Sequence, residues 1–204
     1  MKIDHVFYIN LDYRTDRKSE IESELESYGI LNYERFPAIK HDTIGGVGCG
    51  KSHIEVLKLA KKRGYNNVLI FEDDFQFVVS KEHFKERMQL IENDIVPFFD
   101  VFLLSHNIFQ ETNVSGQSEL RRVIESQTAS GYIVNAHYYD TLIEVFEDAM
   151  PKLEATNYHW IYCIDIVWKP LIVSGLWFRF EPTIGVQRLG SMSDCSNVPN
   201  TQYW

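Results

Sequence analysis

Apolar runs alternate with stretches of helical periodicity through the first half of the chain. Residues 5–11 form a short apolar run of strand-forming residues, and 15–29 then place Ile21, Leu25 and Tyr28 on one helical face. A second strand is expected from 31 and ends before Pro37, followed by an irregular, glycine-rich stretch to Gly50. A helix from Ser52 to Gly64 and a buried strand at 66–71 complete this half.

The second half has a more mixed pattern. Residues 81–94 predict an amphipathic helix, 99–105 a buried strand, 106–120 a polar loop and 120–126 a strand. Residues 131–134 lead into a helix that Pro151 follows, and a short helix at 160–170 is expected to end at Pro170. Extended, hairpin-like structure is expected over 171–182 and an irregular tail over 187–204. The fold class predicted is α/β, a Rossmann-like, mostly parallel sheet with helices on both faces and a mixed C-terminal part.

Composition narrows the classes of protein to which the chain can belong. With 204 residues and 45% apolar content, the chain is expected to form a single domain over 1–204. The net charge of −9 is spread along the chain and argues against a nucleic-acid or anionic-membrane surface. No apolar run is long enough to span a membrane, and Asp4 and His5 interrupt any signal-peptide core, so a cytoplasmic protein is expected.

Three cysteines, Cys49, Cys163 and Cys195, are spread across the chain. They are too few and too scattered for a disulfide framework or for a zinc site of the Cys-x-x-Cys type, and are expected to be reduced thiols. Cys49 is expected to serve as buried packing.

The stretch Gly45–Ser52 contains Gly-x-x-x-x-Gly-Lys-Ser, the letter pattern of a P-loop. A P-loop requires a strand immediately before its first glycine, but that place holds the polar residues Lys40, His41 and Asp42. The pattern is therefore interpreted as a flexible loop before a capped helix, whose start near Lys51 and Ser52 can still approach phosphates. A P-loop-like NTPase or kinase stays as an alternative.

A cluster of carboxylates, Glu72–Asp74, follows the buried strand at 66–71. Ligands of open α/β sheets bind outside the C-terminal ends of strands, and three adjacent carboxylates require a cation to stay ionised together. Oxygen ligands suit Mg²⁺ or Mn²⁺, with a diphosphate completing the shell; the alternative is a solvated acidic turn. Arg14 and Arg17, beyond the first strand, supply charge for a diphosphate, and Asn10 offers an amide that can read a base.

Several separated segments resemble glycosyltransferase family 25, which includes lipopolysaccharide galactosyltransferases and collagen-glycosylating enzymes. They are "FYINLDYRTDR", "RFPAIKH", "GCGKSH", "VLIFEDDF", "SGYIVNAHYYDTLIE", "CIDIVW" and "EPTIGVQRLGSMSD", in the family's order and over nearly the whole chain. The resemblance implies a GT-A type fold, a UDP-sugar donor, a Mn²⁺-type ion and inversion at the sugar carbon. Gly50 and Lys51 depart from the family's more usual small or apolar pair.

The resemblance also implies roles for individual residues. Those carried over to the nucleotide are Asn10, Leu11, Arg14, Arg17 and Ala38, with Gly48, Ser52 and His53 close by. Glu72 and Asp73 would face the ribose or the sugar, and Asp74 would bind the metal. A further metal ligand would be Gln187, Asp194 or water, and His53 is expected to orient its loop.

An inverting transfer also requires a base on the acceptor side of the site. Asp165 is the candidate, because its apolar and aromatic neighbours would raise its pKa; the alternatives are an exposed helix residue or a hydrogen-bond acceptor of structural use. Four aromatic side chains are candidates for sugar stacking, and at least half of them are expected to be core: Trp160, Tyr162, Trp168 and Trp177.

The function expected is metal-dependent, inverting transfer of a hexose, galactose or glucose, from a UDP-sugar to a hydroxyl of a glycan or a hydroxylysine-type protein acceptor. Such a reaction belongs to lipopolysaccharide biosynthesis or collagen glycosylation. Two other hypotheses are the P-loop-like NTPase or kinase and a non-catalytic domain that binds nucleotide sugars.

Overall fold

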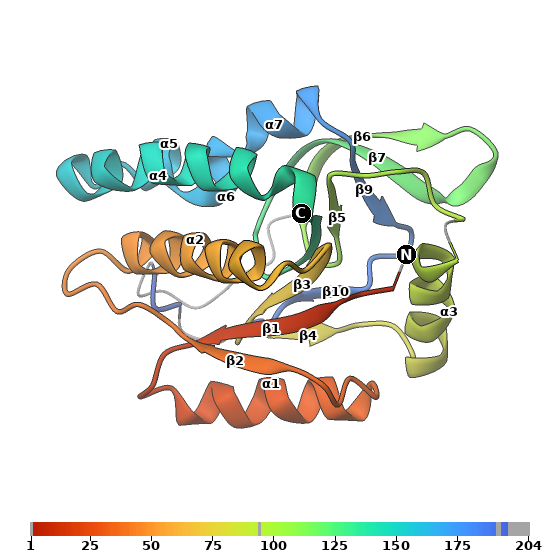
Figure 1. Cartoon of the computed structure of the whole chain (residues 1–204), viewed down its shortest axis with the longest axis horizontal. Coiled ribbons are helices and arrows are strands. Elements are labelled where there is room, and N and C mark those ends of the chain that lie inside the picture. Colours follow the sequence, from red (N-terminus) through yellow and green to blue (C-terminus); the bar gives the residue numbers. More distant parts are fainter. Residues whose placement is uncertain (1, 94, 191–192, 196–204) are drawn as a thin grey trace.

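The structure is a computed structural model, and it describes residues 2–93, 95–190 and 193–195. Its centre is an eight-stranded sheet in the order β2–β1–β3–β8–β5–β9–β7–β6 (Figure 1). Strands β7 and β8 run opposite to their neighbours, and the remaining strands share one direction. The predicted α/β sheet with a mixed C-terminal part is thereby confirmed. The strands are β1 His5–Asn10, β2 Glu34–Pro37, β3 Asn67–Glu72, β5 Val101–Leu103, β6 Asn107–Val114, β7 Gln117–Gln127, β8 Gly131–Asn135 and β9 Trp177–Phe180.

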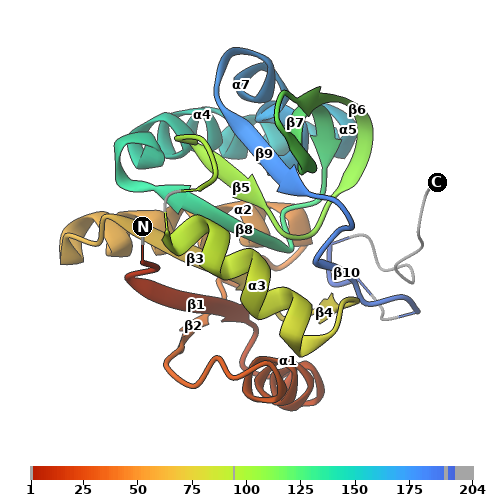
Figure 2. The same ribbon diagram turned by 90° about the vertical axis from the view of Figure 1, so that its right-hand side faces the viewer.

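Helices cover both faces of the sheet (Figures 1 and 2). On one face lie α1 Thr15–Ser27 and α3 Lys81–Glu92, whose buried side chains belong to the same hydrophobic cluster as Val6 and Tyr8 of β1. On the other lie α2 Gly45–Arg63 and α4 Tyr139–Thr156, preceded by the short turn η1 Ala136–Tyr138. Three short helices extend this second layer: α5 His159–Tyr162, α6 Ile164–Val167 and α7 Lys169–Ser174.

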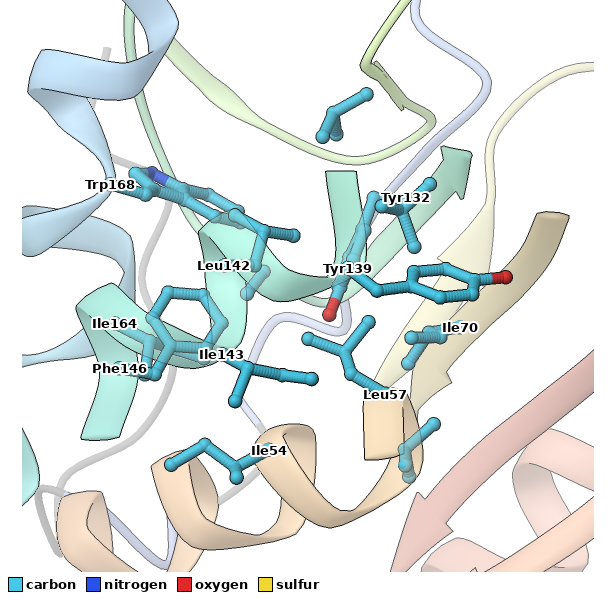
Figure 3. Close-up of a cluster of buried hydrophobic side chains, with 14 of the residues drawn as sticks. Ile54, Leu57, Ile70, Tyr132, Tyr139, Leu142, Ile143, Phe146, Ile164 and Trp168 are labelled. Carbon is cyan, nitrogen blue, oxygen red and sulfur yellow. The ribbon is translucent and has the colours of Figure 1, made fainter. Parts of the chain in front are cut away.

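The buried strands alternate between these two layers. In β1, Phe7 and Ile9 pack with α2, on the side opposite to Val6 and Tyr8. Figure 3 shows the α2 side, where side chains of α2 and α4 meet those of the sheet. Because successive side chains of a strand point to opposite faces, a strand that is apolar throughout must be covered on both sides, as the sequence predicted.

The polar segment 106–120 was predicted as a loop, and this is wrong. It forms most of a hairpin of β6 and β7, with Gly116 in the left-handed conformation at the turn. Strand β6 lies at the edge of the sheet, and its side chains are exposed or only partly buried. An edge strand with little burial on either face carries no apolar alternation, so its sequence resembles that of a loop.

Proline residues mark helix ends less strictly than the sequence suggested. Helix α4 continues through Pro151 to Thr156, and Leu153 beyond the proline is fully buried, so packing stabilises this last turn. Pro170 lies in the first turn of α7 instead of ending a helix, a position where its missing N–H costs little. Residues 171–174 are consequently helical, and extended structure begins only at β9.

The glycine-rich stretch is also helical, which corrects the predicted irregular loop. Helix α2 begins at Gly45, and its glycines allow close contacts with neighbouring segments. A Cβ atom on Gly48 would lie 2.3 Å from the carbonyl oxygen of Ile39, and one on Gly50 would lie 2.2 Å from Sδ of Met150. The low helix propensity of glycine is therefore overridden by packing.

A second, two-stranded sheet pairs β4 Phe75–Phe77 with β10 Gly185–Gln187. It places Gln187 opposite Phe75, and the N–H of Arg188 donates to the carbonyl of Asp74 over 2.6 Å. The segment that follows β10 is thus brought to the edge of the large sheet at which β3 ends. The tail was predicted to be irregular; β10 occupies its first residue, while 191–192 and 196–204 lie outside the described residues.

Among the helices of the described ranges, none combines the length and the apolar character that crossing a membrane requires.

Replacing Gly48 with alanine is expected to lower the free energy of unfolding by about 1–3 kcal/mol, because the new Cβ would collide with backbone. Urea unfolding followed by circular dichroism measures the change. Gly46→Ala is the matched control: its Cβ would lie 3.2 Å from Nδ1 of His159, a side chain that can move. Its cost should be below about 1 kcal/mol, since alanine also favours the helix. Equal losses in the two variants would contradict this explanation.

Candidate active site

A cavity of about 130 Å³ lies beyond the C-terminal ends of β1 and β3, where the first turns of α2 meet the segment 193–195. This is the edge at which open α/β sheets bind ligands. The side chains that line it come from segments far apart in the sequence. They are Ile9, Asn10, Leu11, Tyr13, Arg17, Ala38, Ile39, Lys40, His41, Gly45, Cys49, Ser52, Glu72, Asp73, Asp74, Gln187, Ser193, Asp194 and Cys195.

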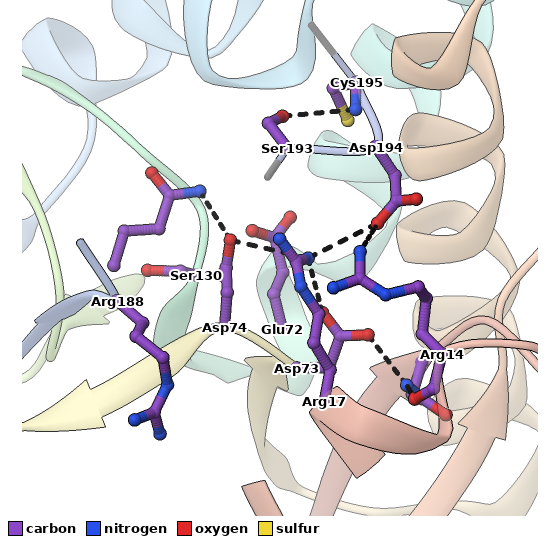
Figure 4. Close-up of polar contacts among 12 residues, drawn as sticks. Arg14, Arg17, Glu72, Asp73, Asp74, Ser130, Arg188, Ser193, Asp194 and Cys195 are labelled. Atoms are coloured by element: carbon purple, nitrogen blue, oxygen red, sulfur yellow. Dashed lines mark hydrogen bonds and ion pairs between the residues drawn. The ribbon is translucent and has the colours of Figure 1, made fainter. Parts of the chain in front are cut away.

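A buried ion pair forms one wall of the cavity. Nη1 of Arg17 lies 2.9 Å from Oδ1 of Asp73, and both side chains are nearly inaccessible to solvent. Burial raises the pKa of Asp73, and the Arg17 guanidinium and a hydrogen bond from Asn10 act in the opposite direction. Arg17 also lies 3.8 Å from Asp74 and 3.6 Å from Asp194, so one guanidinium faces three carboxylates (Figure 4).

Asp74 is the next carboxylate along the chain, and it is buried. Its Oδ2 accepts a hydrogen bond of 3.2 Å from the amide of Gln187, which β10 delivers. Asp74, Gln187 and Asp194 all line the cavity, so the residues named as possible metal ligands face one space. The third ligand position itself stays a prediction.

Glu72 faces α2 and is held by two side chains of that helix. Its Oε1 lies 3.1 Å from Nε2 of His53 and accepts a hydrogen bond of 3.3 Å from the thiol of Cys49. Burial alone would raise the pKa of Glu72, but the hydrogen bond and charge of His53 lower it. His53 is fully buried, and its Nδ1 lies 2.9 Å from the hydroxyl of Tyr132. The histidine thus orients a carboxylate of the site rather than its own loop.

The amide of Asn10 is engaged by the protein itself. Its Nδ2 donates to Asp73 and to the carbonyl of Arg14, and its Oδ1 accepts from Nε of Arg35. These contacts fix the turn after β1 against the acidic cluster. Asn10 therefore positions Asp73, and its side chain is less available to read a base than the sequence suggested.

Ser52 joins two segments of the cavity wall. Its hydroxyl donates to the carbonyl of Gly48 over 2.7 Å and accepts from the N–H of Ile39 over 2.8 Å. Ala38 is held in turn by its N–H, which donates to the carbonyl of Asn10. The segment 38–41 is thereby fixed between β1 and α2.

The segment Ser193–Cys195 lies across the cavity and places a carboxylate among the arginines (Figure 4). Asp194 forms an ion pair with Arg14, and its Oδ1 accepts a hydrogen bond of 2.9 Å from the hydroxyl of Tyr13. Its carbonyl oxygen approaches the first turn of α2 so closely that a Cβ on Gly45 would lie 2.0 Å from it. The space left is smaller than the roughly 300–1,000 Å³ of typical ligand sites.

Asp165 lies outside this cavity, on α6. Its Oδ2 accepts a hydrogen bond of 3.1 Å from the N–H of Thr128, a residue with the unusual φ of 77°. Burial raises the pKa of Asp165, and the nearby charge of Glu72 acts in the same direction. The raised pKa agrees with the sequence prediction. The hydrogen bond from Thr128 also gives the carboxylate a structural role.

The predicted residues divide into two groups. Those that line the cavity are Asn10, Leu11, Arg17, Ala38, Ser52, Glu72, Asp73 and Asp74. Arg14, Gly48 and His53 contact lining residues without lining it themselves: Arg14 holds Asp194, Gly48 packs against Ile39, and His53 holds Glu72. Their roles in binding stay predictions.

Sequence reasoning missed several lining residues: Tyr13, Lys40, His41 and the neighbours of Asp194, Ser193 and Cys195. Tyr13 lies in the same turn as Arg14, which the sequence had already identified as a candidate. Its side chain is 55% exposed, and Nζ of Lys40 lies 5.4 Å from the centre of its ring. An exposed aromatic in that turn was the available signal. Cys195 carried no local signal, because contacts between distant segments, the β4–β10 pairing and those of Asp194, bring it here.

Lys51, the lysine of the P-loop lettering, points away from the cavity. Its Nζ lies 3.2 Å from Glu154 on α4, and the helix that carries it starts at Gly45 with no strand directly before it. Neither the lysine nor the backbone has the arrangement of a P-loop.

The aromatic candidates behave largely as core. Trp168 and Trp177 are fully buried with ring centres 5.0 Å apart, as expected for at least half of the set. Trp160 is 69% exposed and stacks on Tyr158, so it presents an aromatic surface.

Comparison with known proteins gives relatives at modest identity. No family model matches the chain. A glycosyltransferase 25 family member of Aedes aegypti is 23% identical over 185 residues, covering 75% of this chain and 30% of that protein. One of Drosophila pseudoobscura pseudoobscura is 28% identical over 104 residues, covering 38% and 16%. Among solved structures, a glycosyltransferase involved in glycosylation of the major capsid of PBCV-1 aligns over 87% of this chain and 92% of its own, with 9% identity and a TM-score of 0.44.

The two curated relatives confirm the family resemblance that the motifs indicated. The chain spans about a third or less of the length of these proteins. It is thus similar, over up to three quarters of its own length, to members of glycosyltransferase family 25.

Proposed function

We propose that the chain is a metal-dependent glycosyltransferase that takes a hexose, galactose or glucose, from a UDP-sugar and transfers it with inversion to a hydroxyl of a glycan or of a hydroxylysine-type protein acceptor. One observation carries the proposal: Arg17 meets the carboxylates of Asp73 and Asp74 in one cavity at the C-terminal edge of the sheet, and Arg14 lies beside it through Asp194. Similarity to proteins named as glycosyltransferases supports it.

The donor set suits a hard divalent cation. Asp74 and Gln187 offer carboxylate and amide oxygens to one cavity, and Mn²⁺ and Mg²⁺ prefer oxygen ligands. Asp74 would be the principal ligand, because its carboxylate is buried and lies beside the space that a diphosphate would enter. A bound cation supplies charge neutralisation for the departing diphosphate.

The arginines would bind the diphosphate itself. Arg14 directly precedes α1 and Arg17 lies in its first turn, and both meet Asp194 at the cavity. Arg17 remains anchored by Asp73 while it faces the ligand, which keeps the guanidinium in place. Glu72, fixed by His53, would accept hydroxyl hydrogen bonds from ribose or sugar.

UDP together with Mn²⁺ is expected to raise the melting temperature of the chain, whereas ATP with Mg²⁺ should not. A ligand at a hundred times its Kd stabilises the folded state by about 2.7 kcal/mol. Asp74→Asn should remove the metal-dependent part of the shift, because the amide keeps the shape and loses the charge. Asp16→Asn, on an exposed residue, serves as the control. Stabilisation by ATP and none by UDP would refute the proposal, and UDP binding without release of UDP from any UDP-sugar would favour a non-catalytic binding domain.

Asp165→Asn is expected to lower the transfer rate by roughly 10²–10⁴-fold while UDP binding stays unchanged. Asparagine can still accept the hydrogen bond of Thr128, so the fold should survive. A base must be ionised, and the raised pKa of Asp165 means that the wild-type rate should fall, as pH decreases, at a higher pH than an ordinary aspartate would give. Rates with a UDP-sugar across pH measure both effects. An unchanged rate and profile would assign Asp165 to the structural role alone.

Asp194→Asn should tighten UDP binding several-fold, because Asp194 competes with the diphosphate for Arg14 and Arg17. Calorimetric titration with UDP and Mn²⁺ measures the change. The opposite sign, weaker binding, would assign Asp194 to the metal as a ligand. Asp148→Asn is the control here, since Asp148 is exposed on α4 and pairs with Lys152 instead of with either arginine.

A further inference from the structure

Two of the three cysteines meet at the cavity beside a buried histidine and a carboxylate. Cys49 and His53 stand four residues apart on α2 and so share one helical face. Oε of Glu72, Nε2 of His53 and Sγ of Cys49 all lie within 4.8 Å of one another. Cys195 lines the same cavity from the C-terminal segment, and its proximity contributes to raising the pKa of the Cys49 thiol.

We infer that Cys49, His53, Glu72 and Cys195 form a binding site for a thiophilic divalent cation, best suited to Zn²⁺. This site is distinct from the oxygen ligands around Asp74. Zinc takes thiolate, imidazole and carboxylate ligands in tetrahedral sites, and these four side chains are of those types.

The spacing of three of the ligand atoms, those of Cys49, His53 and Glu72, fits such a site. Zinc–ligand bonds of about 2.0–2.3 Å place neighbouring tetrahedral ligand atoms roughly 3.3–3.8 Å apart. Oε1 of Glu72 lies 3.1 Å from Nε2 of His53 and 3.3 Å from Sγ of Cys49. Only small side-chain movements would therefore be needed to admit the ion.

The surroundings of His53 support the same assignment. A histidine that binds zinc through Nε2 usually donates its other N–H to an oxygen, which fixes the ring. Nδ1 of His53 lies 2.9 Å from the hydroxyl of Tyr132, and both residues are fully buried. The ring is thus already held with Nε2 toward Glu72.

The zinc site and the oxygen ligands around Asp74 prefer different metals because their ligand atoms differ. Sulfur and nitrogen ligands favour Zn²⁺, whereas oxygen ligands favour Mn²⁺ and Mg²⁺. With both thiols ionised, the four side chains carry three negative charges against the two positive charges of the ion. One negative charge therefore remains at the occupied site.

A zinc ion at this site would also fix the segment that closes the cavity. Cys195 is adjacent to Asp194, the residue that occupies Arg14 and Arg17, so zinc would hold that carboxylate in place. Zinc would then oppose UDP binding; this consequence rests on the proposed function, whereas the zinc site itself does not.

The test is titration of the metal-free chain with Zn²⁺ against a chromophoric chelator, under a reductant that keeps the thiols free. We expect one ion per chain, and binding weaker by roughly a hundredfold or more in Cys49→Ser and in Cys195→Ser. Cys163→Ser is the matched control and should bind as the wild type does. With Co²⁺ in place of Zn²⁺, a thiolate-to-metal charge-transfer band should appear and should weaken in each of the two ligand variants.

Equal zinc affinity in the wild type and in Cys195→Ser would overturn the site, as would a cobalt spectrum without the thiolate band. Cys195 lies in the C-terminal segment outside both hydrophobic cores, so this variant tests the site even if Cys49→Ser fails to fold. A second titration measures UDP binding with and without Zn²⁺. Loss of the zinc effect in Cys195→Ser supports the consequence for UDP, and failure of UDP to bind at all would refute the proposed function while leaving the zinc result intact.

Discussion

The buried ion pair of Arg17 and Asp73 is the contact on which the site depends. Asp73 and Asp74 come directly after a strand of the core, where carboxylates would otherwise be poorly solvated and would repel one another. One guanidinium, placed by the first turn of α1, compensates for both. Removing a single partner of such a pair leaves an uncompensated buried charge, which is far more costly than the pair's own net contribution. The strand end, the turn after β1 and α1 are therefore coupled.

The small β4–β10 sheet has an equally specific consequence. By pairing with the strand that follows Asp74, β10 brings residues from the end of the chain to a cavity otherwise built from its first 74 residues. Gln187 and Asp194 reach the acidic edge in this way. The glycines of α2 contribute from the other side, because they let the segment around Ile39 and the backbone of Asp194 approach the helix.

The parts of the molecule that follow from local pattern were predictable. Strands β1 and β3 are continuous apolar runs, so their burial and the position of Glu72–Asp74 at a strand end could be read from the sequence. The start of α2 at Gly45 could not be read from the sequence, because backbone contacts with Ile39 and Asp194 override the low helix propensity of glycine. Neither could Cys195 be placed, since long-range contacts, the β4–β10 pairing and the ion pair of Asp194 with Arg14, bring it to the cavity. Local chemistry identified the acidic cluster, and tertiary contacts decided its neighbours.

Asp194 is joined by only a few residues to β10, which is fixed in the fold. A carboxylate on such a short tether presents itself to the arginines at an effective concentration of about millimolar order, independent of how dilute the protein is. Under the proposed function, a free diphosphate would have to outcompete this built-in anion. The built-in anion would then set a lower limit on the donor concentration at which the site fills.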